Sequence, residues 1–283
     1  MPVMQRPAMK IAVTSGKGGV GKTSLTVNLA VALARLGHRV GVVDADFALG
    51  NVDVMLGLAP QSHLGAVISG ECSVDDVTIE GPHGVRIVPA GSGVRALTQL
   101  DTHEWTRLAE AFVVASRDLD FLIVDTASGV SDNVIDLIGL VDYALVVTAL
   151  EPAAVVDAYA VIKLVSASHR TKGIGVVVNA AEDADEADLV FRQLSMAADK
   201  FLGRALRYDG FVVHDVELQM AVRGQALVAD RDDAEGASRC FRRLARRLAA
   251  SRPAWTAPPV PVPGPRPDVA LEAVHGEDAH RCA

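Results

Sequence analysis

Cysteine is scarce in this chain, and its three cysteines lie far apart along the sequence. Cys72, Cys240 and Cys282 form neither a C-x-x-C pair nor a Cys/His cluster, so no disulfide framework and no cysteine-based metal site is expected. The eight histidines are scattered, without a pair at metal-ligand spacing. Neither a G-x-S-x-G elbow nor a Cys/His dyad signature occurs, which leaves nucleophilic catalysis without support. These absences favour a protein of the reducing cytoplasm.

Long apolar runs and an excess of positive charge are also missing. No run reaches the roughly 18 residues that a membrane-spanning helix needs, and residues 1–10 lack the apolar core of a signal peptide. The formal net charge of −8 argues against broad binding to nucleic acid, so DNA is not an expected partner. Since half of the residues are hydrophobic, we expect a folded, soluble protein that could touch a membrane only at its cytoplasmic face.

What the chain does have is an alternation of short apolar runs with longer helical patterns. This alternation predicts an α/β fold, a doubly wound and mostly parallel sheet flanked by helices, and the uninterrupted apolar runs fit strands buried on both faces. The predicted strands are 11–14, 40–43, 85–88, 121–124, 144–148, 174–178 and 211–213. The predicted helices are 22–36, 102–116, 133–140, 154–168, 187–202 and 237–248.

The prolines divide the chain into unequal parts. Seven of the 13 prolines fall between Pro253 and Pro267, and the segment after them is polar and weakly patterned, so it cannot bury enough apolar surface to order itself. We therefore predict a short N-terminal extension over residues 1–8, one domain over residues 9–250 and a proline-rich disordered tail over residues 251–283.

A complete phosphate-binding motif, G-x-x-x-x-G-K-[ST], follows the first predicted strand. Its glycines let successive backbone N–H groups converge on phosphate oxygens. Lys22 can reach the β- and γ-phosphates, and the Thr23 hydroxyl can ligate Mg²⁺. The motif predicts a nucleoside triphosphate site formed by Gly16, Lys17, Gly18, Gly19, Val20, Gly21, Lys22, Thr23 and the adjoining Ser24.

The second lysine of this motif, Lys17, is unusual. With it, the segment resembles the deviant phosphate loop K-G-G-x-G-K-[ST] of the MinD/ParA family. That resemblance implies ATP and Mg²⁺ as ligands, and a homodimer in the ATP state in which Lys17 contacts the nucleotide of the partner subunit. It also implies an ATP hydrolase in which Lys17 and Lys22 assist catalysis.

Carboxylates end two of the predicted strands. Asp44 and Asp46 follow 40–43, and Asp125 follows 121–124, so all three are expected at the edge of the sheet where ligands bind. An apolar strand ending in aspartate also fits a Walker-B element that helps to hold Mg²⁺. By the family resemblance Asp46 orients the attacking water and Asp44 organises the Mg²⁺ shell. The other interpretation is that Asp44 and Asp46 only cap a loop.

Residues near the base are predicted from two further strand ends. Asn179 follows the strand 174–178, and an amide can both donate to and accept from adenine; in the family an asparagine here reads the base. By the same resemblance the segment with His214 and Asp215 closes over the base, although Val213 stands where the family commonly has proline. A helix cap or turn role for Asn179 is the alternative.

Within the family, the segments 48–53 and 125–133 are most similar to the flagellar-number regulators of the FlhG (FleN) group. This resemblance covers about residues 9–250 and implies a switch that controls flagellum number or placement, or the position of a cell pole or division site. It also implies an effector protein, such as an FlhF-like GTPase or a flagellar component. The alternatives are a ParA-type DNA partition ATPase and a slow nucleotide-dependent scaffold or transcription co-regulator.

The helix expected at 237–250 has two unlike faces. Ala237, Phe241, Leu244, Ala245 and Leu248 share one side, and five arginines share the other. Such a helix could lie against anionic lipid as a peripheral membrane contact. The same pattern describes a helix packed on its own domain with solvated arginines, and both interpretations stay open at this point.

Overall fold

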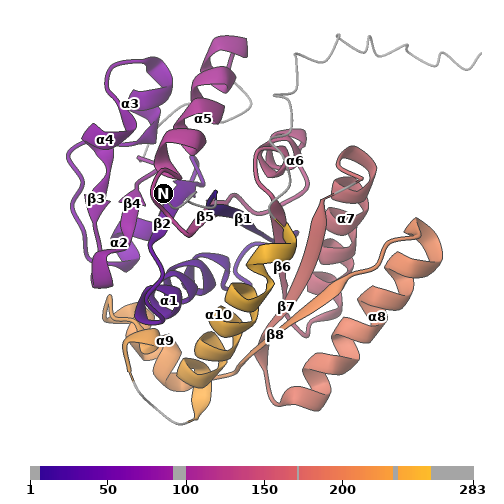
Figure 1. The fold of residues 1–283 in the computed structure, drawn as a ribbon. Helices are drawn as coiled ribbons and strands as arrows, with labels where there is room; N and C mark the ends of the chain where they lie inside the picture. The colour runs from indigo at the N-terminus through magenta and orange to yellow at the C-terminus, as the bar shows by residue number, and fades with distance from the viewer. Residues whose placement is uncertain (1–6, 92–99, 171, 232–234, 256–283) are drawn as a thin grey trace, which may run out of the picture.

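The computed structural model describes residues 7–91, 100–170, 172–231 and 235–255 of the 283-residue chain. Its strands form one sheet in the order β3-β4-β2-β5-β1-β6-β7-β8 (Figure 1). All neighbouring strands are parallel except β3 and β4, which are antiparallel. The strands are β1 (Met9–Thr14), β2 (Val40–Ala45), β3 (Ile79–Glu80), β4 (Arg86–Val88), β5 (Phe121–Thr126), β6 (Tyr143–Thr148), β7 (Gly173–Ala181) and β8 (Arg207–Val213). The predicted doubly wound α/β fold is confirmed.

Helices cover both faces of this sheet. They are α1 (Lys22–Arg35), α2 (Val52–Met55), α3 (Leu64–Ser69), α4 (Val74–Val77), α5 (Thr102–Ala115), α6 (Asp132–Gly139), α7 (Pro152–Ser168), α8 (Ala184–Leu202), α9 (Val216–Arg223) and α10 (Gly236–Trp255), with short 3₁₀ turns η1 (Pro82–Gly84) and η3 (Val228–Asp230). All seven predicted strands and all six predicted helices are present. The sequence patterns missed β3, α2, α3, α4 and α9, all of them short elements.

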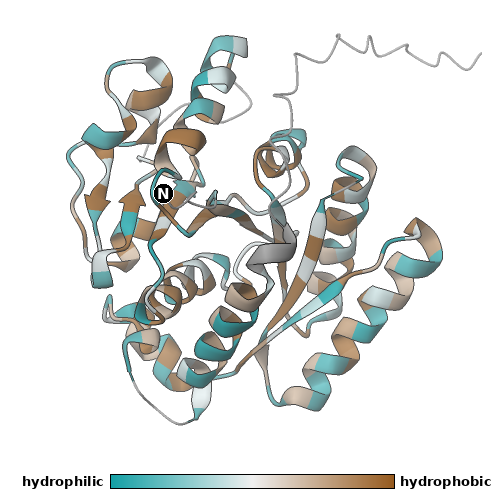
Figure 2. Ribbon diagram, in the orientation of Figure 1, coloured by the Kyte–Doolittle hydropathy of each residue, from teal (hydrophilic) through white to brown (hydrophobic). Residues whose placement is uncertain are grey.

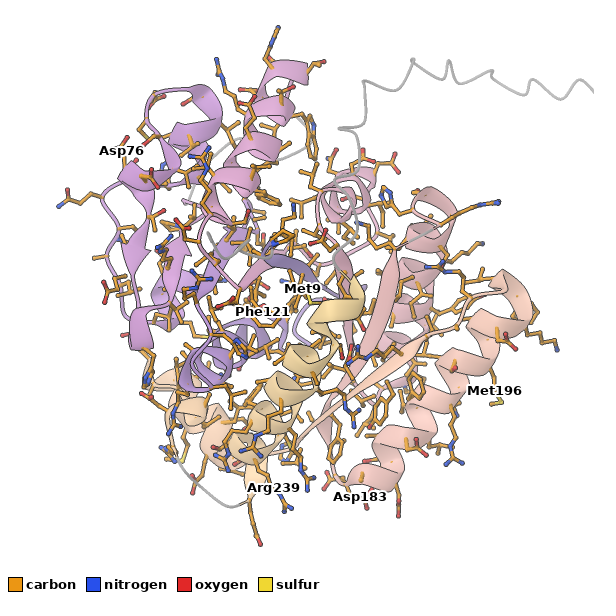
Figure 3. All side chains as sticks on the ribbon, viewed as in Figure 1. Met9, Asp76, Phe121, Asp183, Met196 and Arg239 are labelled. Carbon is orange, nitrogen blue, oxygen red and sulfur yellow. The ribbon has the colours of Figure 1, made fainter. Side chains whose placement is uncertain are left out.

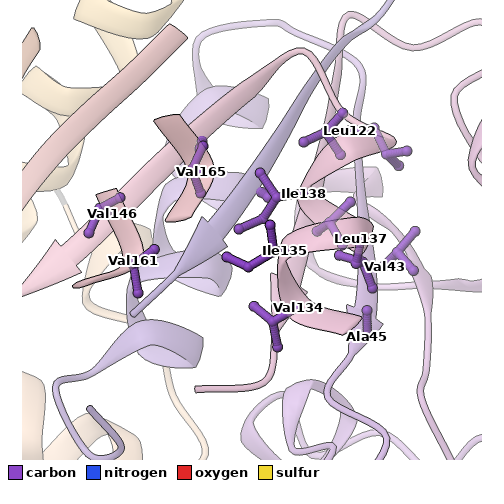
Figure 4. Close-up of a cluster of buried hydrophobic side chains, with 14 of the residues drawn as sticks. Val43, Ala45, Leu122, Val134, Ile135, Leu137, Ile138, Val146, Val161 and Val165 are labelled. Atoms are coloured by element: carbon purple, nitrogen blue, oxygen red, sulfur yellow. The ribbon is translucent and has the colours of Figure 1, made fainter. Parts of the chain in front are cut away.

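Two hydrophobic clusters hold the layers together. One joins the sheet to α3–α8; there Leu122, Val43 and Val146 of the strands meet the apolar faces of α6 and α7 (Figure 4). The other joins the opposite face to α1, α2, η3 and α10. Figure 2 shows the same division, with hydrophobic strands in the middle and hydrophilic residues on the outer sides of the helices. The parallel strands are therefore buried on both faces, as their continuous apolar runs indicated.

The arginine-rich helix α10 packs on its own domain. The apolar residues expected on one side, among them Phe241 and Leu248, are at most 2% exposed and belong to the cluster shared with α1. Arg239 lies on the outer side of α10, whereas Met9 and Phe121 lie in the interior (Figure 3). The structure thus favours the packing interpretation for this helix.

The last helix runs past residue 250, the position at which the domain was predicted to end. α10 continues to Trp255, and inside it the Ser251 hydroxyl donates to the Arg247 carbonyl at 2.7 Å, so the helix does not end at residue 250. The rest of the predicted tail, 256–283, lies outside the described residues, as does most of the predicted extension at 1–8. Within the described part, none of the helices combines the length and the apolar character needed to cross a membrane.

Candidate functional site

A glycine-rich loop joins the end of β1 to the start of α1. Gly19 and Gly21 have φ of 80° and 89°, the left-handed region that glycine adopts without a steric penalty. Gly16 lies so close to α7 that a side chain there would overlap the backbone of Asp157. α1 begins at Lys22 with no side-chain cap and no acidic residue in its first turn. Its first N–H groups and its positive dipole end can therefore face an anion.

A buried hydroxyl beside this loop has no hydrogen-bond partner in the described part of the chain. Ser24 lines the same cavity as Gly18–Gly21, and its Oγ atom is buried. A buried hydroxyl without a partner costs free energy. A phosphate oxygen held in the loop would satisfy it, which fits the predicted place of Ser24 in the nucleotide site.

Asp125, at the end of β5, gathers three donors from the first turns of α1. Its carboxylate accepts from the Lys22 ammonium at 3.4 Å, from the Thr23 hydroxyl at 2.6 Å and from the Thr26 hydroxyl at 3.0 Å. The side chains of Lys22 and Asp125 are only 8% and 1% exposed. Burial raises the pKa of Asp125, while Lys22 and the two hydroxyls oppose that rise. Three residues predicted from two motifs, Lys22 and Thr23 from the phosphate loop and Asp125 from the Walker-B element, therefore form one cluster.

Asp44 lies next to this cluster because β2 and β5 are neighbours in parallel register. It stands opposite Asp125 in the sheet and is fully buried. Its two oxygens accept from the N–H groups of Asp46 at 3.0 Å and Val52 at 3.1 Å. Burial, followed by the charge of Asp125, raises the pKa of Asp44 to about 7. Two carboxylates so close together and so far from water favour a cation beside them.

The donors in this region suit Mg²⁺. Mg²⁺ takes oxygen ligands and usually combines one or two carboxylates with phosphate oxygens and several waters. Thr23, Asp44 and Asp125 supply a hydroxyl and two carboxylates. Over the described ranges no group of three or more His, Cys, Asp or Glu residues could hold a metal ion by itself. The residues present therefore fit an ion whose shell is completed by phosphate and water.

Asp46 is held beside this pair by its own loop. Its Oδ1 atom accepts from the Leu49 N–H at 3.1 Å, and its backbone N–H is the one bound to Asp44. Gly50 passes so close that a Cβ atom there would lie 3.1 Å from Asp44 Oδ2. The residue at the place of the family's usual loop glycine, Ala48, is exposed and leaves these contacts intact.

A cavity of about 520 Å³ lies between the phosphate loop and α9. This volume is within the range of ligand pockets. It brings together predicted residues from three distant parts of the sequence: the phosphate loop, Asn179, and the pair His214–Asp215. The lining residues are Lys17, Gly18, Gly19, Val20, Gly21, Ser24, Ala149, Glu151, Asn179, Ala180, Val213, His214, Asp215, Leu218, Gln219, Val222 and Arg223.

Asn179 is positioned by the phosphate loop itself. Its Nδ2 atom donates to the Val20 carbonyl at 2.7 Å, and a Cβ atom on Gly21 would overlap it. The next residue, Ala180, has φ of 55°, and the pairing of β7 with β8 is irregular there. The predicted base reader thus stands at a bend of β7 that turns toward the cavity wall.

His214 and Asp215 are tied to the helices that follow β8. The His214 ring and the Gln219 amide lie 3.1 Å apart. The Asp215 carboxylate accepts from the N–H groups of Glu217 and Ala237, each at 2.8 Å. Asp215 therefore caps α9 and binds the first turn of α10, a structural role that its sequence motif did not indicate.

The signature lysine, Lys17, does not point into the Asp125 cluster. Its ammonium lies 3.2 Å from Glu151 Oε2, and the two side chains are 40% and 64% exposed. Glu151 immediately precedes α7. Lys17 is thus held at the rim of the cavity, where it can be reached by another molecule.

Some residues of the site were not predicted from the sequence. Thr26 is three residues after Thr23, and this helical spacing could have placed both hydroxyls on Asp125. The wall formed by Leu218, Gln219, Val222 and Arg223 had no such signal, because α9 is a single short helix that no motif identifies.

The family is decided by comparison with known proteins. The model of the family described as ParA, "NUBPL iron-transfer P-loop NTPase", matches residues 7–193, more than half of the chain. This chain belongs to the ParA/MinD family of P-loop NTPases. Membership in the ParA/MinD family explains the extra lysine, Lys17, of its phosphate loop.

Two ParA/MinD relatives and one solved structure give the closer context. The chain is 43% identical over 242 residues to "Antiactivator FleN" of Pseudomonas aeruginosa, with 86% of each chain covered. It is 30% identical over 221 residues to "Flagellum site-determining protein YlxH" of Helicobacter pylori, covering 77% of this chain and 74% of that protein. It superposes with a TM-score of 0.69 and 26% identity on one chain of the solved MinC:MinD cell division protein complex of Aquifex aeolicus, covering 86% of this chain and 96% of that chain.

Proposed function

We propose that this protein hydrolyses ATP to ADP and phosphate, and that residues 9–250, together with the end of α10, form its ATPase domain. The observation that carries the proposal is the buried cluster in which Asp125 binds Lys22 and Thr23, with Asp44 opposite it. Phosphoryl transfer needs mainly positioning and charge neutralisation, and this cluster supplies both beside an anion-binding loop.

The residues divide the work of the reaction. The loop N–H groups and Lys22 hold the phosphates, and the Ser24 hydroxyl donates a hydrogen bond to a phosphate oxygen. Asn179, His214 and Asp215 border the base. Bound Mg²⁺, held by Thr23, Asp44 and Asp125, would neutralise negative charge on the phosphates. Asp46 orients a water molecule toward the γ-phosphorus; the new P–O bond forms as the bond to the β–γ bridging oxygen breaks, releasing ADP and phosphate.

Dimerisation in the ATP state is the second part of the proposal. Lys17 is at the cavity rim and is released from Glu151 to contact the phosphates of a partner subunit. Exposed apolar side chains follow several strand ends of the same edge of the sheet: Leu49, Val130, Val156, Val216 and Met220. Exposed apolar side chains are typical of a protein–protein contact, and two of these, Val216 and Met220, belong to α9, the helix that forms the cavity wall.

The cellular role follows the relatives. The similarity to an antiactivator FleN and to a flagellum site-determining protein supports control of flagellum number or placement, with cell-pole or division-site positioning as the related role. The solved complex of MinD with MinC supports an effector protein as a partner, such as an FlhF-like GTPase or a flagellar component. We expect a cytoplasmic protein whose peripheral contact with the membrane, if α10 makes one, requires its apolar face to leave the core.

A ParA-type role in DNA partition has less support. Arg170, Lys172, Arg204 and Arg207 are the basic residues that such a role could use. Lys172 is buried and donates to the carbonyls of Gly139 and Val141, Arg204 donates to two carbonyls, and Arg207 pairs with Asp209. These cations serve the fold and offer little to a phosphate backbone. The slow scaffold or transcription co-regulator also has less support, because Asp46 and Asp125, the residues that hydrolysis would need, are both present.

Light scattering coupled to size exclusion tests the proposal, with Mg²⁺ plus ADP or ATP and with phosphate release measured in parallel. We expect ATP alone to double the mass. Asp46→Ala should keep the doubled form and release little phosphate, whereas Lys17→Ala should stay monomeric. If the mass never responds to ATP, the proposed dimer is contradicted. If the wild type releases no phosphate, the proposed ATPase activity is contradicted.

A further inference from the structure

A single side chain connects the segment after Asp46 to the wall of the nucleotide cavity. Gln225, which lies just beyond the end of α9, donates from its Nε2 atom to the Val54 carbonyl of α2 at 2.7 Å. A carbonyl oxygen can only accept, so the amide nitrogen must be the atom that faces it. The two residues are 171 positions apart in the sequence, so this contact joins regions that no local pattern connects.

The backbone around Gln225 fixes the direction of this side chain. Gln225 has φ of 52°, in the left-handed region that residues other than glycine seldom adopt. The turn is closed by hydrogen bonds from Gln225 N to Val222 O and from Ala226 N to Ala221 O. Gly57, at the turn after α2, faces the same amide, since a Cβ atom there would lie 3.5 Å from Gln225 Oε1.

Both helices that Gln225 joins reach the site at their other ends. The first residue of α2, Val52, donates its N–H to Asp44. α9 supplies four residues of the cavity wall, and its start is capped by Asp215. Val52 and Ala221 also belong to the same buried cluster. A chain of contacts therefore runs from Asp44 through α2 and Gln225 to the α9 wall of the cavity.

We propose that Gln225 is a positioning residue that couples the Asp46 loop and α2 to the α9 wall. A ligand that reaches the carboxylates through a γ-phosphate shifts the loop and α2, and the Val54–Gln225 contact passes this shift to α9. α9 then closes more firmly on the rest of the nucleotide. The coupling rests on the proposed function, because it needs a nucleotide in this cavity. The net contribution of one hydrogen bond corresponds to about a twofold to tenfold change in an equilibrium.

Hydrogen–deuterium exchange of the α9 amides tests the coupling in the full-length chain with Mg²⁺ plus ADP or the non-hydrolysable analogue AMPPNP. In the wild type we expect slower exchange with the analogue than with ADP. Gln225→Glu keeps the size of the side chain but turns the donor into an acceptor, and it should reduce the ratio of the two rates about twofold to tenfold. Gln225→Gly removes the side chain at a φ that glycine tolerates, and it should reduce the ratio of the two exchange rates as Gln225→Glu does. Gln193→Glu, the same exchange at an exposed position of α8, should leave the ratio unchanged.

Two further measurements separate this coupling from the proposed function. Binding of a fluorescent ATP analogue and phosphate release are followed for the wild type and each variant. A wild type that binds and hydrolyses ATP, but whose ratio is unaltered by both Gln225 substitutions, overturns the coupling alone. A wild type in which α9 exchanges equally with both nucleotides overturns it too. A wild type that binds no nucleotide overturns the proposed function and the coupling together.

Discussion

At the scale of single residues, the most constrained position in the site is Asp44. Its carboxylate accepts two backbone N–H groups, yet burial and the charge of Asp125 outweigh them and raise its pKa to about 7. The fold therefore tolerates this group best when it is protonated or neutralised by a cation. A residue predicted to organise a Mg²⁺ shell is thus also a source of instability in the free protein.

This arrangement predicts a pH dependence of stability. Because the folded pKa lies above the unfolded value, the folded state binds more protons between the two, and stability falls as the pH rises through that window. As the pH rises from 5 to 8, the ionisation of Asp44 should lower the free energy of unfolding by about 2–3 kcal/mol in total. In Asp44→Asn this pH-dependent loss should disappear, whatever pH-independent cost the lost backbone contacts add.

Urea denaturation at pH 5 and pH 8 gives the free energy of unfolding of the wild type and of Asp44→Asn. The quantity to compare is the change in unfolding free energy between the two pH values, since this change excludes effects that are equal at both. Adding Mg²⁺ and ADP to the wild type should shrink the change as well, because a nearby cation favours the ionised carboxylate. An equal change in wild type and Asp44→Asn would contradict the role of Asp44 ionisation.

At the scale of elements, the apolar runs predicted the sheet because strands buried on both faces must be continuously hydrophobic. The phosphate loop and the strand-terminal aspartates could also be predicted from the sequence, since their chemistry depends on local spacing. The α9 wall and the Lys17–Glu151 pair were not, because both arise from contacts between distant segments. For α10 the two-faced pattern was visible, but what covers the apolar face depends on packing that no pattern within the helix records.

Substitutions on the two faces of α10 should differ sharply in their effect on stability. Phe241 is fully buried against the cluster shared with α1, so Phe241→Ala should cost about 3–5 kcal/mol. Arg243 is exposed, and Arg243→Ala should change stability by no more than about 0.5 kcal/mol. Urea denaturation gives both values, and Phe241→Leu, which keeps most of the volume, should fall between them. A small cost for Phe241→Ala would indicate that α10 is only loosely attached, as a helix available to a membrane would be.

At the scale of the whole molecule, the site is incomplete in one respect. The cavity, the carboxylates and the phosphate loop lie within one chain, but Lys17 is turned to the rim and paired with Glu151. In the proposed dimer the same ammonium must leave Glu151 to reach the partner's nucleotide. The pair therefore opposes dimerisation, and its strength sets how far the monomer is favoured.

Glu151→Gln should shift this balance toward the dimer. Both partners are substantially exposed, and an exposed ion pair contributes at most about 1 kcal/mol. A symmetric dimer breaks one such pair in each subunit, so the apparent dimer Kd should fall by at most about thirtyfold. Sedimentation velocity over a concentration series with Mg²⁺ and ATP measures this Kd for wild type and Glu151→Gln in the Asp46→Ala background, where hydrolysis does not deplete the dimer. The difference should shrink at high salt, which screens exposed charges. If Glu151→Gln instead weakens the dimer, Glu151 supports the associated state and the pair does not hold Lys17 back.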